Sequence, residues 1–514
     1  MTMALAGEDD PFKDPSLAGT QTPLSQQDHG DRVAGTTLAV GRNASLTLGT
    51  DSLIVLDEGL LETRSANCCG ISLTPGKNKT TRSIPFFNIL WAEHSEDGEI
   101  VIHYAHAESK HAVRPAIISY ELEQKEREYT DAWIASLLDR AYGPSQRRKR
   151  IKVLVNPFGG KGKAQKLYHR RIAPIFAAAQ CELDVERTQY NGHAVEIAQN
   201  INTEAYDVIA CCSGDGVPHE VFNGLGRKDD AARALARIAV AQLPCGSGNA
   251  LSLNMNGTNS PSLAALAVVK GLRTPLDLVS ITQGDKRTLS FLSQSVGIVA
   301  ETDLATEHLR WMGSARFTWG FFVRLVGKTI YPADIAAMVE VDNKDAIRDV
   351  YSAESSKPPP SYDDRPVPGT ETRLPNLKWG TVNDPLPSEW ELVPHDKLGN
   401  FYAGNMAYMS PDANFFPASL PSDGCIDLIR IRGDIKRLTA IGTLLAIAEH
   451  KFFDLDHVDY QKISAYRIIP KNQPDGYISI DGERVPFEPF QAEVHRGLGT
   501  VLSRSGHMYE AKGV

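Results

Sequence analysis

The stretch "YDVIACCSGDGVPHEVFNGL", residues 206–225, predicts a buried strand, a glycine-rich turn and an amphipathic helix in direct succession. A short apolar run bounded by turn residues is typical of a strand that is buried on both faces. Asp215 stands between Gly214 and Gly216, and glycines on either side indicate a tight turn where something comes close to the backbone. The stretch therefore predicts a strand of a parallel α/β sheet with a carboxylate just beyond its end.

Strand and helix signals alternate on both sides of this stretch, over residues 150–276. The segments "IKVLVNP", "AQKLYHRRIAPIFAAAQ", "CELDVERTQ", "HAVEIAQNI" and "RIAVAQLPCGSGN" predict a doubly wound α/β domain, with helices on both faces of a parallel sheet. Over residues 277–514 strand signals such as "CIDLIRIR" and "KISAYRIIP" predominate, which predicts an antiparallel β-sandwich domain. A Pro-rich polar segment at about residues 343–394 interrupts this domain and is expected to be a disordered surface loop.

The N-terminal part of the chain differs in character from the rest. Residues 1–35 are polar and rich in Gly, Asp, Gln and Pro, so we expect them to be disordered. Over residues 36–145, alternating runs such as "EIVIHYAHA" predict strands, and "YTDAWIASLLDRAY" has apolar residues at helical spacing. Several strands followed by one helix resemble a pleckstrin-homology-like (PH-like) module. The expected fold class is therefore α/β plus β, with a small N-terminal α+β module.

Composition narrows the class of protein. The chain has 514 residues, 42% of them hydrophobic and 23% charged, and a net charge of −9, which argues against nucleic acid as a partner. The most apolar run, residues 439–448, is far shorter than a membrane-spanning helix requires. The first residues lack the pattern of a secretory signal, and the seven cysteines lack metal-ligand spacing. These features predict a cytoplasmic protein with free thiols.

Three glycine-rich segments each follow a predicted strand: "NPFGGKGKA" at residues 156–164, "SGDG" at 213–216 and "PCGSGNALS" at 244–252. The first is not a Walker A loop, because the spacing of its glycines and Ala164 after Lys163 do not fit that motif. Loops at the carboxyl ends of parallel strands converge on one edge, where backbone N–H groups can bind phosphate. Each loop is also compatible with a plain tight connection. Asp215 is suited to accept a proton from an attacking hydroxyl, or to form a local Asx turn.

The segments "VNPFGGKGKA", "SGDGVPHEVFNGL", "LPCGSGNALS" and "DGERV" together resemble the diacylglycerol-kinase catalytic superfamily. "SVGIVAETDLATEHLRWMGSARFTWG" and "FFPASLPSDGCIDLIRI" narrow the resemblance to sphingosine kinases, especially fungal sphingoid long-chain-base kinases. The resemblance implies transfer of the γ-phosphate of ATP, with Mg²⁺, to the 1-hydroxyl of a sphingoid base. The alternatives are a diacylglycerol or ceramide kinase, and a catalytically inert lipid-binding adaptor.

The resemblance also implies roles for individual residues. Asp215 matches the catalytic base, and Asp303 matches the residue that holds the lipid head group, where a carboxylate suits a protonated amine. Without the resemblance, Asp303 is better suited to be a helix N-cap, and Asp481 with Gly482 is suited to form a hairpin turn. Asp481 and Glu483 match an acidic pair near the nucleotide and its Mg²⁺, with Asp481 as the candidate metal ligand. The positions that match nucleotide contacts are Asn156, Gly159, Gly160, Thr188, Ser213, Gly214, Gly216, Ser247, Gly248, Asn249, Arg310, Arg316, Asp481, Gly482 and Glu483.

A lipid substrate implies contact with a membrane, so we expect peripheral association with intracellular membranes or the plasma membrane. The adjacent Cys68 and Cys69 are candidates for S-acylation, or are simply idle thiols. The amphipathic segment from Leu438 to Phe453 is suited to face either a lipid surface or the core. A homodimer is compatible with the sequence.

Overall fold

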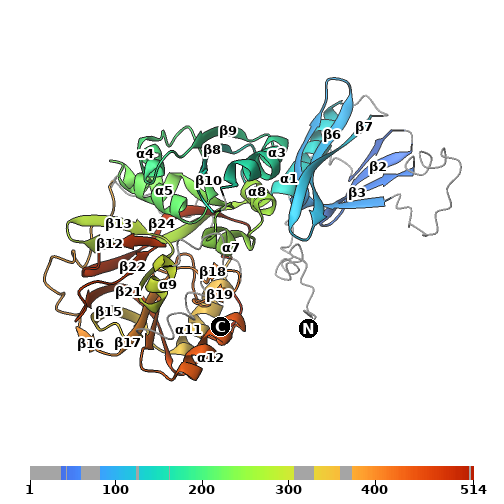
Figure 1. Cartoon of the computed structure of the whole chain (residues 1–514). Coiled ribbons are helices and arrows are strands. Elements are labelled where there is room, and N and C mark those ends of the chain that lie inside the picture. Colours follow the sequence, from blue (N-terminus) through green and yellow to red (C-terminus); the bar gives the residue numbers. More distant parts are fainter. Residues whose placement is uncertain are drawn as a thin grey trace, which may run out of the picture. The chain divides into compact units, whose positions relative to one another are not determined.

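The computed structural model describes residues 36–41, 43–58, 81–122, 127–160, 162–305, 329–358, 373–508 and 511–514. It divides into two compact units, residues 1–147 with 174–180, and residues 148–173 with 181–514 (Figure 1). Four site predictions, Cys68, Cys69, Arg310 and Arg316, lie outside the described residues, as does the expected disordered segment 1–35.

The N-terminal unit consists of two antiparallel sheets and a helix. The first sheet contains β1 (Thr37–Val40), β2 (Ala44–Leu48), β3 (Ser52–Asp57) and β4 (Thr81–Pro85), and the second contains β5 (Ile89–His94), β6 (Glu99–Ser109) and β7 (Ala112–Glu121). Helix α1 (Arg127–Tyr142) buries Trp133 and Leu137 and packs against β5, where the Tyr142 hydroxyl donates to the Leu90 carbonyl. Strands followed by one helix agree with the α+β expectation, while the PH-like assignment stays a prediction.

The larger unit begins with a parallel sheet in the order β9-β8-β10-β11. Successive residues of β10 face opposite sides: Cys211 joins the core that contains Phe222 of α5, and the Cys212 thiol contacts the Ala164 carbonyl of α2. Helices therefore cover both faces, as predicted. The strands are β8 (Arg150–Val155), β9 (Glu182–Arg187), β10 (Val208–Ser213) and β11 (Ala239–Pro244), and the helices are α2 (Ala164–Leu167), α4 (His193–Asn200), α5 (Gly216–Gly226), α6 (Ala231–Arg237), α7 (Ala250–Asn256) and α8 (Pro261–Lys270). Helix α3 (Ala173–Ala178) belongs, from residue 174 onward, to the N-terminal unit.

Antiparallel strands dominate the rest of this unit and enclose a second core around Phe401, Tyr466 and Ile468. The strands are β12 (Leu272–Gln283), β13 (Lys286–Ser290), β14 (Ser293–Gly297), β15 (Ala333–Val341), β16 (Val393–His395), β17 (Leu398–Gly404), β18 (Tyr408–Ser410), β19 (Ala413–Asn414), β20 (Ile426–Arg432), β21 (Val458–Pro470), β22 (Ile478–Ile480), β23 (Glu483–Val485) and β24 (Phe490–Ser503). The helices α9 (Ile298–Ala305), α11 (Lys344–Ser355) and α12 (Arg437–Ala448) accompany them. The fold class is thus α/β plus β.

Strand β24 joins the parallel and antiparallel parts. It pairs antiparallel with β12 from Leu272↔Ser503 to Thr282↔Gln491, and in parallel with β11 at Val240↔Val501. Apart from the β18–β19 hairpin, which forms a sheet of its own, the described strands from both parts therefore form one hydrogen-bonded sheet. The expected boundary at residue 276 falls inside β12, because β12 pairs with the last strand, β24, which also pairs with β11 of the parallel sheet. The β-sandwich stays a prediction.

The expected disordered loop at residues 343–394 is partly ordered. It contains helix α11, whose N-cap Asn343 accepts from the backbone of Asp345 and Ala346. Farther on, Trp379 and Trp390 pack together on the core. The Glu493 carboxylate accepts from the backbone N–H groups of residues 378 and 379, at 2.9 and 3.0 Å. Two aromatic anchors and a buried acceptor thus order a segment that its composition had marked as loop, while residues 359–372 lie outside the described part.

Candidate active site

Three glycine-rich loops meet at the carboxyl ends of β8, β10 and β11. A Cβ at Gly246 would lie 2.3 Å from the Gly214 Cα, and a Cβ at Gly160 would lie 3.0 Å from the Cys245 carbonyl oxygen. Gly160 also has a φ of +57°, which side chains other than glycine rarely adopt. The glycines are therefore required because these loops pack backbone against backbone, and the convergence predicted from the sequence is found.

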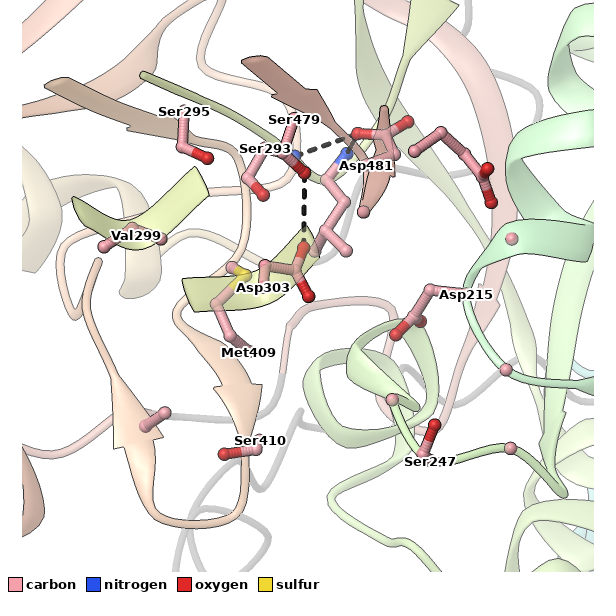
Figure 2. A pocket seen from close by; sticks show the side chains of 18 of the residues that line it. Asp215, Ser247, Ser293, Ser295, Val299, Asp303, Met409, Ser410, Ser479 and Asp481 are labelled. Atoms are coloured by element: carbon pink, nitrogen blue, oxygen red, sulfur yellow. Dashed lines mark hydrogen bonds between the residues drawn. The ribbon is translucent and has the colours of Figure 1, made fainter. Parts of the chain in front are cut away.

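A cavity of about 710 Å³ opens beside the loops, a volume typical of small-molecule sites. The glycine loops line one side. The opposite side is lined by residues of β14, α9 and α12, and by the turn between β22 and β23. Figure 2 shows Asp215 and Asp303 projecting into this cavity from different elements, with Ser247 on the side of Asp215 and Ser479 beside Asp303.

Asp215 directly precedes helix α5, yet its side chain makes no capping bond to that helix. Its Oδ2 accepts from the Ala250 N–H at 2.9 Å, and its Oδ1 accepts from the Leu251 N–H at 3.1 Å and the Gln242 Nε2 at 3.0 Å. The alternative of a local Asx turn is not found, because the donors come from β11 and the start of α7. Three donors from other elements hold the carboxylate in one orientation.

Burial raises the pKa of Asp215, and the negative charge of Asp481 raises it further. Hydrogen bonds from Ala250, Leu251 and Gln242 lower this pKa. The net direction is upward from the ordinary value. A carboxylate with a raised pKa is a stronger proton acceptor when it is ionised, which suits a general base.

Asp303 lies within α9, which begins at Ile298, so the N-cap alternative is not found. Its Oδ2 accepts from the Ser479 hydroxyl at 3.2 Å (Figure 2). The same oxygen lies 3.8 Å from the position that a Cβ of Gly482 would take. Asp303 therefore faces the cavity beside the turn between β22 and β23.

Asp481 and Gly482 form the two-residue turn between β22 and β23, with φ angles of +53° and +84°. The hairpin alternative is thus the observed structure. The Asp481 side chain is also saturated with donors. Oδ1 accepts from the Ser290 hydroxyl and the N–H groups of Leu292 and Ser293, and Oδ2 accepts from the Phe291 N–H and bonds to His219 Nδ1. A carboxylate offers about four acceptor positions, so this side chain has none left for Mg²⁺.

His219, on the first turns of α5, lies 2.8 Å from Asp481 through Nδ1. Burial lowers the pKa of His219, but the hydrogen bond and charge of Asp481 outweigh burial and raise it. One turn later the Asn223 amide accepts from the Leu289 N–H and donates to the Leu289 carbonyl, at 2.9 and 2.8 Å. These two side chains fasten α5, the helix that follows Asp215, to β13 and the β22–β23 turn.

The metal-binding potential of the cavity depends on Glu483. Among the described residues no three His, Cys, Asp or Glu side chains gather as a self-sufficient metal site. Glu483 is exposed, and its Oε1 lies 3.1 Å from the position that a Cβ of Gly216 would take. Mg²⁺ in phosphate-binding sites is commonly held by one or two carboxylates together with substrate phosphates, and Glu483 beside the glycine loops fits that arrangement.

Most of the described predicted site residues line the cavity. Two do not: Ser213 is fully buried and donates to the Gly214 carbonyl, while the Asn249 side chain bonds to both backbone groups of Gly246. They shape the loops instead of facing a ligand. Those that line the cavity are Asn156, Gly159, Gly160, Thr188, Gly214, Asp215, Gly216, Ser247, Gly248, Asp303, Asp481, Gly482 and Glu483.

Sequence reasoning missed Gln242, His219 and Ser479, which contact Asp215, Asp481 and Asp303, respectively. Gln242 carried a signal, since an amide inside the apolar strand "IAVAQLP" needs a buried partner. His219 also carried one, since it lies one helical turn after Asp215. Nothing local marked Ser479.

Comparison with known proteins places these features in a family. A family model for the diacylglycerol kinase catalytic domain matches residues 150–281, and a domain of unknown function (DUF7493) matches residues 36–143. A solved diacylglycerol kinase structure from Bacillus anthracis superposes with a TM-score of 0.47 at 16% identity, over 70% of this chain and 98% of that one.

Curated relatives match over greater lengths of the chain. Sphingoid long chain base kinase 5 of Saccharomyces cerevisiae is 34% identical, over 77% of this chain and 66% of that protein, so the chain spans just under two thirds of it. Sphingoid long chain base kinase 4 of Schizosaccharomyces pombe is 34% identical over 82% and 88%, and sphingosine kinase 1 of Rattus norvegicus is 31% identical over 69% and 91%. As its motifs predicted, the chain belongs to the family of sphingoid long-chain-base and sphingosine kinases.

Proposed function

We propose that the protein transfers the γ-phosphate of ATP to the 1-hydroxyl of a sphingoid base, with Asp215 as the general base. The observation that carries this proposal is the position of Asp215 and Asp303 in one cavity, between glycine loops on one side and apolar side chains on the other (Figure 2). A phosphate donor fits the first side, and a lipid with a cationic head group fits the second.

The glycine loops support the nucleotide half of the proposal. They place backbone groups without side chains at the ends of three parallel strands, where phosphates bind in open α/β sheets. Bound Mg²⁺, held by Glu483 and the phosphates, would offset the phosphate charge as the bond to the leaving group breaks. Arg310 and Arg316 are proposed to add cationic contacts, as the family resemblance implies.

The charge of the cavity supports a cationic lipid as the substrate that accepts the phosphate. No Lys or Arg is found among the described residues that line it, while six carboxylates are. A protonated amine is stabilised in such surroundings, whereas the uncharged head of a diacylglycerol or ceramide gains no such stabilisation. We assign the amine to Asp303. The six are Asp215, Glu220, Asp303, Asp412, Asp481 and Glu483.

Apolar side chains support a long alkyl chain beyond the head group. The cavity continues past Asp303 between α9, α12 and the β18–β19 hairpin. Its lining there is mainly apolar, with Thr302, Ser410 and Asp412 as polar members, and the apolar side chains include Val299, Met409, Phe415, Leu444 and Ile447. The burial of each methylene against such a wall favours binding by about 0.8 kcal/mol.

In the proposed step Asp215 accepts the proton of the substrate hydroxyl as its oxygen bonds to the γ-phosphorus. The bond between that phosphorus and the bridging oxygen breaks, and ADP leaves with the electron pair. The donors Ala250, Leu251 and Gln242 fix the carboxylate, and their bonds to Oδ2 and Oδ1 leave an Oδ2 lone pair available for the proton. Removal of a positioned general base costs about 10² to 10⁴ in rate.

The test is transfer of labelled phosphate from ATP to dihydrosphingosine, phytosphingosine, ceramide and diacylglycerol in mixed micelles, with Asp215→Asn beside the wild type. We expect transfer to the free bases alone, and its loss in Asp215→Asn while Mg·ATP still raises the melting temperature. Near-full turnover by Asp215→Asn would refute the role of the base.

Asp303→Asn separates the lipid classes, because it removes the charge and keeps the shape. Selective loss of free-amine substrates is expected, and transfer to ceramide or diacylglycerol by the wild type would overturn the assignment. A protein without Mg·ATP stabilisation and without transfer would be the inert adaptor. We further propose that the enzyme is cytoplasmic, uses no nucleic acid and works peripherally at a membrane, with a PH-like N-terminal module.

A further inference from the structure

Helix α12 presents a row of apolar side chains to solvent. Leu438 is 83% exposed and Leu445 is 60% exposed, and their spacing of seven residues puts them on one side of the helix. Gly442 between them is also exposed. The opposite side of α12 is buried in the unit through Ala440 and Ile447. The helix therefore has two apolar sides, one of which has no partner within the described residues.

The exposed row is continuous with the wall of the active-site cavity. Ile441, Leu444, Leu445 and Ala448 line that cavity, and Leu445 is therefore both a cavity residue and a surface residue. Helix α12 lies at the periphery of the larger unit (Figure 1). The apolar interior of the cavity thus reaches the surface of the protein along this helix.

Cationic side chains lie at the beginning of α12. Lys436 and Arg437 are both exposed, and neither forms an ion pair with another described residue. Nearby, the Asp434 carboxylate is shared by Arg432 and Lys397, at 2.7 and 3.1 Å, so cations exceed anions at this end. At the other end Glu449 is paired with Lys451 at 2.9 Å. An exposed apolar row beside unpaired cations is the combination that binds an anionic lipid surface.

The basic run at residues 147–152, in contrast, offers little to such a surface. Lys149 is 2% exposed and donates to the Val269 carbonyl, and Lys152 is 8% exposed and paired with Asp184 and Glu186. Arg150 is paired with Asp207 at 2.7 Å. These cations are used in contacts within the protein at the start of β8. The cations of α12 are therefore the better match for lipid head groups.

We propose that α12 docks on an anionic bilayer through Leu438 and Leu445, with Lys436 and Arg437 at the head groups, and delivers the lipid substrate directly into the cavity. This inference rests on the proposed function, because only an alkyl-chain substrate gains from the arrangement. A sphingoid base that crossed water would expose every methylene of its chain, whereas passage along a docked α12 keeps the chain in apolar surroundings.

The test is co-sedimentation of the full chain with vesicles of phosphatidylcholine, with and without phosphatidylserine, in the absence of nucleotide and substrate. The variants are Leu438→Asp and Lys436→Glu, and the matched control is Leu392→Asp, which alters a 38% exposed leucine of the same unit. None of these residues lines the cavity. We expect Leu438→Asp to weaken binding about tenfold or more, because one leucine leaves the bilayer.

Lys436→Glu is expected to reduce the advantage of phosphatidylserine vesicles, and Leu392→Asp to bind as the wild type does. Equal binding by Leu438→Asp and the wild type would overturn the proposal, and so would a wild-type dimer that Leu438→Asp dissociates, because a second copy would then cover the row. Activity on a short-chain, water-soluble sphingoid base is measured in parallel. Activity on this substrate that is retained in Leu438→Asp supports docking. If the wild type shows no activity on it, the proposed function is overturned, and docking is then judged from vesicle binding alone.

Discussion

Replacement of Asp481 by asparagine is expected to destabilise the larger unit by about 3 to 5 kcal/mol, as the breaking of a buried ion pair does. The Asp481 side chain is fully buried and meets five donors. An amide has a single acceptor atom, so its NH₂ group must replace either Oδ1 or Oδ2. At the Oδ2 position it would face the Phe291 N–H, which cannot reverse its role, although the His219 ring can change tautomer.

The pH dependence follows from the pKa directions of the pair. Burial would raise the pKa of Asp481, but the hydrogen bond and charge of His219 and the bonds from Ser290 and Ser293 lower it below its ordinary 3.8. Its contribution is therefore present above pH 3.8 and is lost as the pH falls through the lowered value. The raised pKa of His219 contributes stability that is complete below its ordinary 6.5 and is lost as the pH rises through the raised value. The stability difference between wild type and Asp481→Asn should thus be largest between about pH 4 and 6.5.

The assay is urea unfolding followed by intrinsic fluorescence at pH 5, 7 and 9. Glu483→Gln is the matched control, because Glu483 lies on the same hairpin but is exposed, and its free energy of unfolding should change by less than about 0.5 kcal/mol. The reasoning would be refuted if Asp481→Asn unfolded with the wild-type midpoint and only required more Mg²⁺ for activity. That result would restore Asp481 as a metal ligand.

Three further changes test other parts of the site. Gly246→Ala should cost about 1 to 3 kcal/mol and reduce the Mg·ATP thermal shift, because its Cβ meets the Gly214 backbone at 2.3 Å, whereas Gly442→Ala, with nothing within 4 Å, should be neutral or stabilising. Gln242→Leu removes a hydrogen bond that lowers the pKa of Asp215, so kcat should fall about tenfold and the acidic limb of the pH profile of kcat should move to higher pH. An acidic limb at the wild-type pH would contradict this role of Gln242. Lys462→Met leaves the buried Asp423 and Asp427 without the cation that lies 2.9 Å from each, and should lower the free energy of unfolding by about 3 to 5 kcal/mol; a wild-type urea midpoint would contradict this role of Lys462.

The parallel sheet and the glycine side of the cavity were predictable because their signals are local. Each strand is a short apolar run, each loop directly follows its strand, and the carboxyl ends of parallel strands share one edge. The position of Asp215 follows from these rules alone. The assignment of Asp303 depended on resemblance, since nothing in its neighbourhood distinguishes a ligand-binding carboxylate from a helix cap.

The rest was not predictable because it depends on contacts between distant parts of the chain. The turn at Asp481 follows from its DG sequence, but the donors of Phe291, Leu292 and Ser293 lie about 190 residues earlier. Strand β24 pairs with β12 across more than 200 residues, which no local period reveals. In residues 373–394 the Pro-rich composition predicted a loop, although Trp379 had the apolar area to order it.

Asp481 links the groups to which different chemical roles are assigned. Its hairpin carries Glu483 beside Gly216, and His219 fastens the helix that follows Asp215. The backbone donors at residues 291–293 lead into β14 and then into α9, which carries Asp303. One buried carboxylate thus positions the proposed base, the acidic metal-binding candidate and the proposed lipid-binding carboxylate together. Loss of activity in an Asp481 variant is therefore no proof of a chemical role, because the same change would displace all three groups, and only stability measured without ligands separates the two explanations.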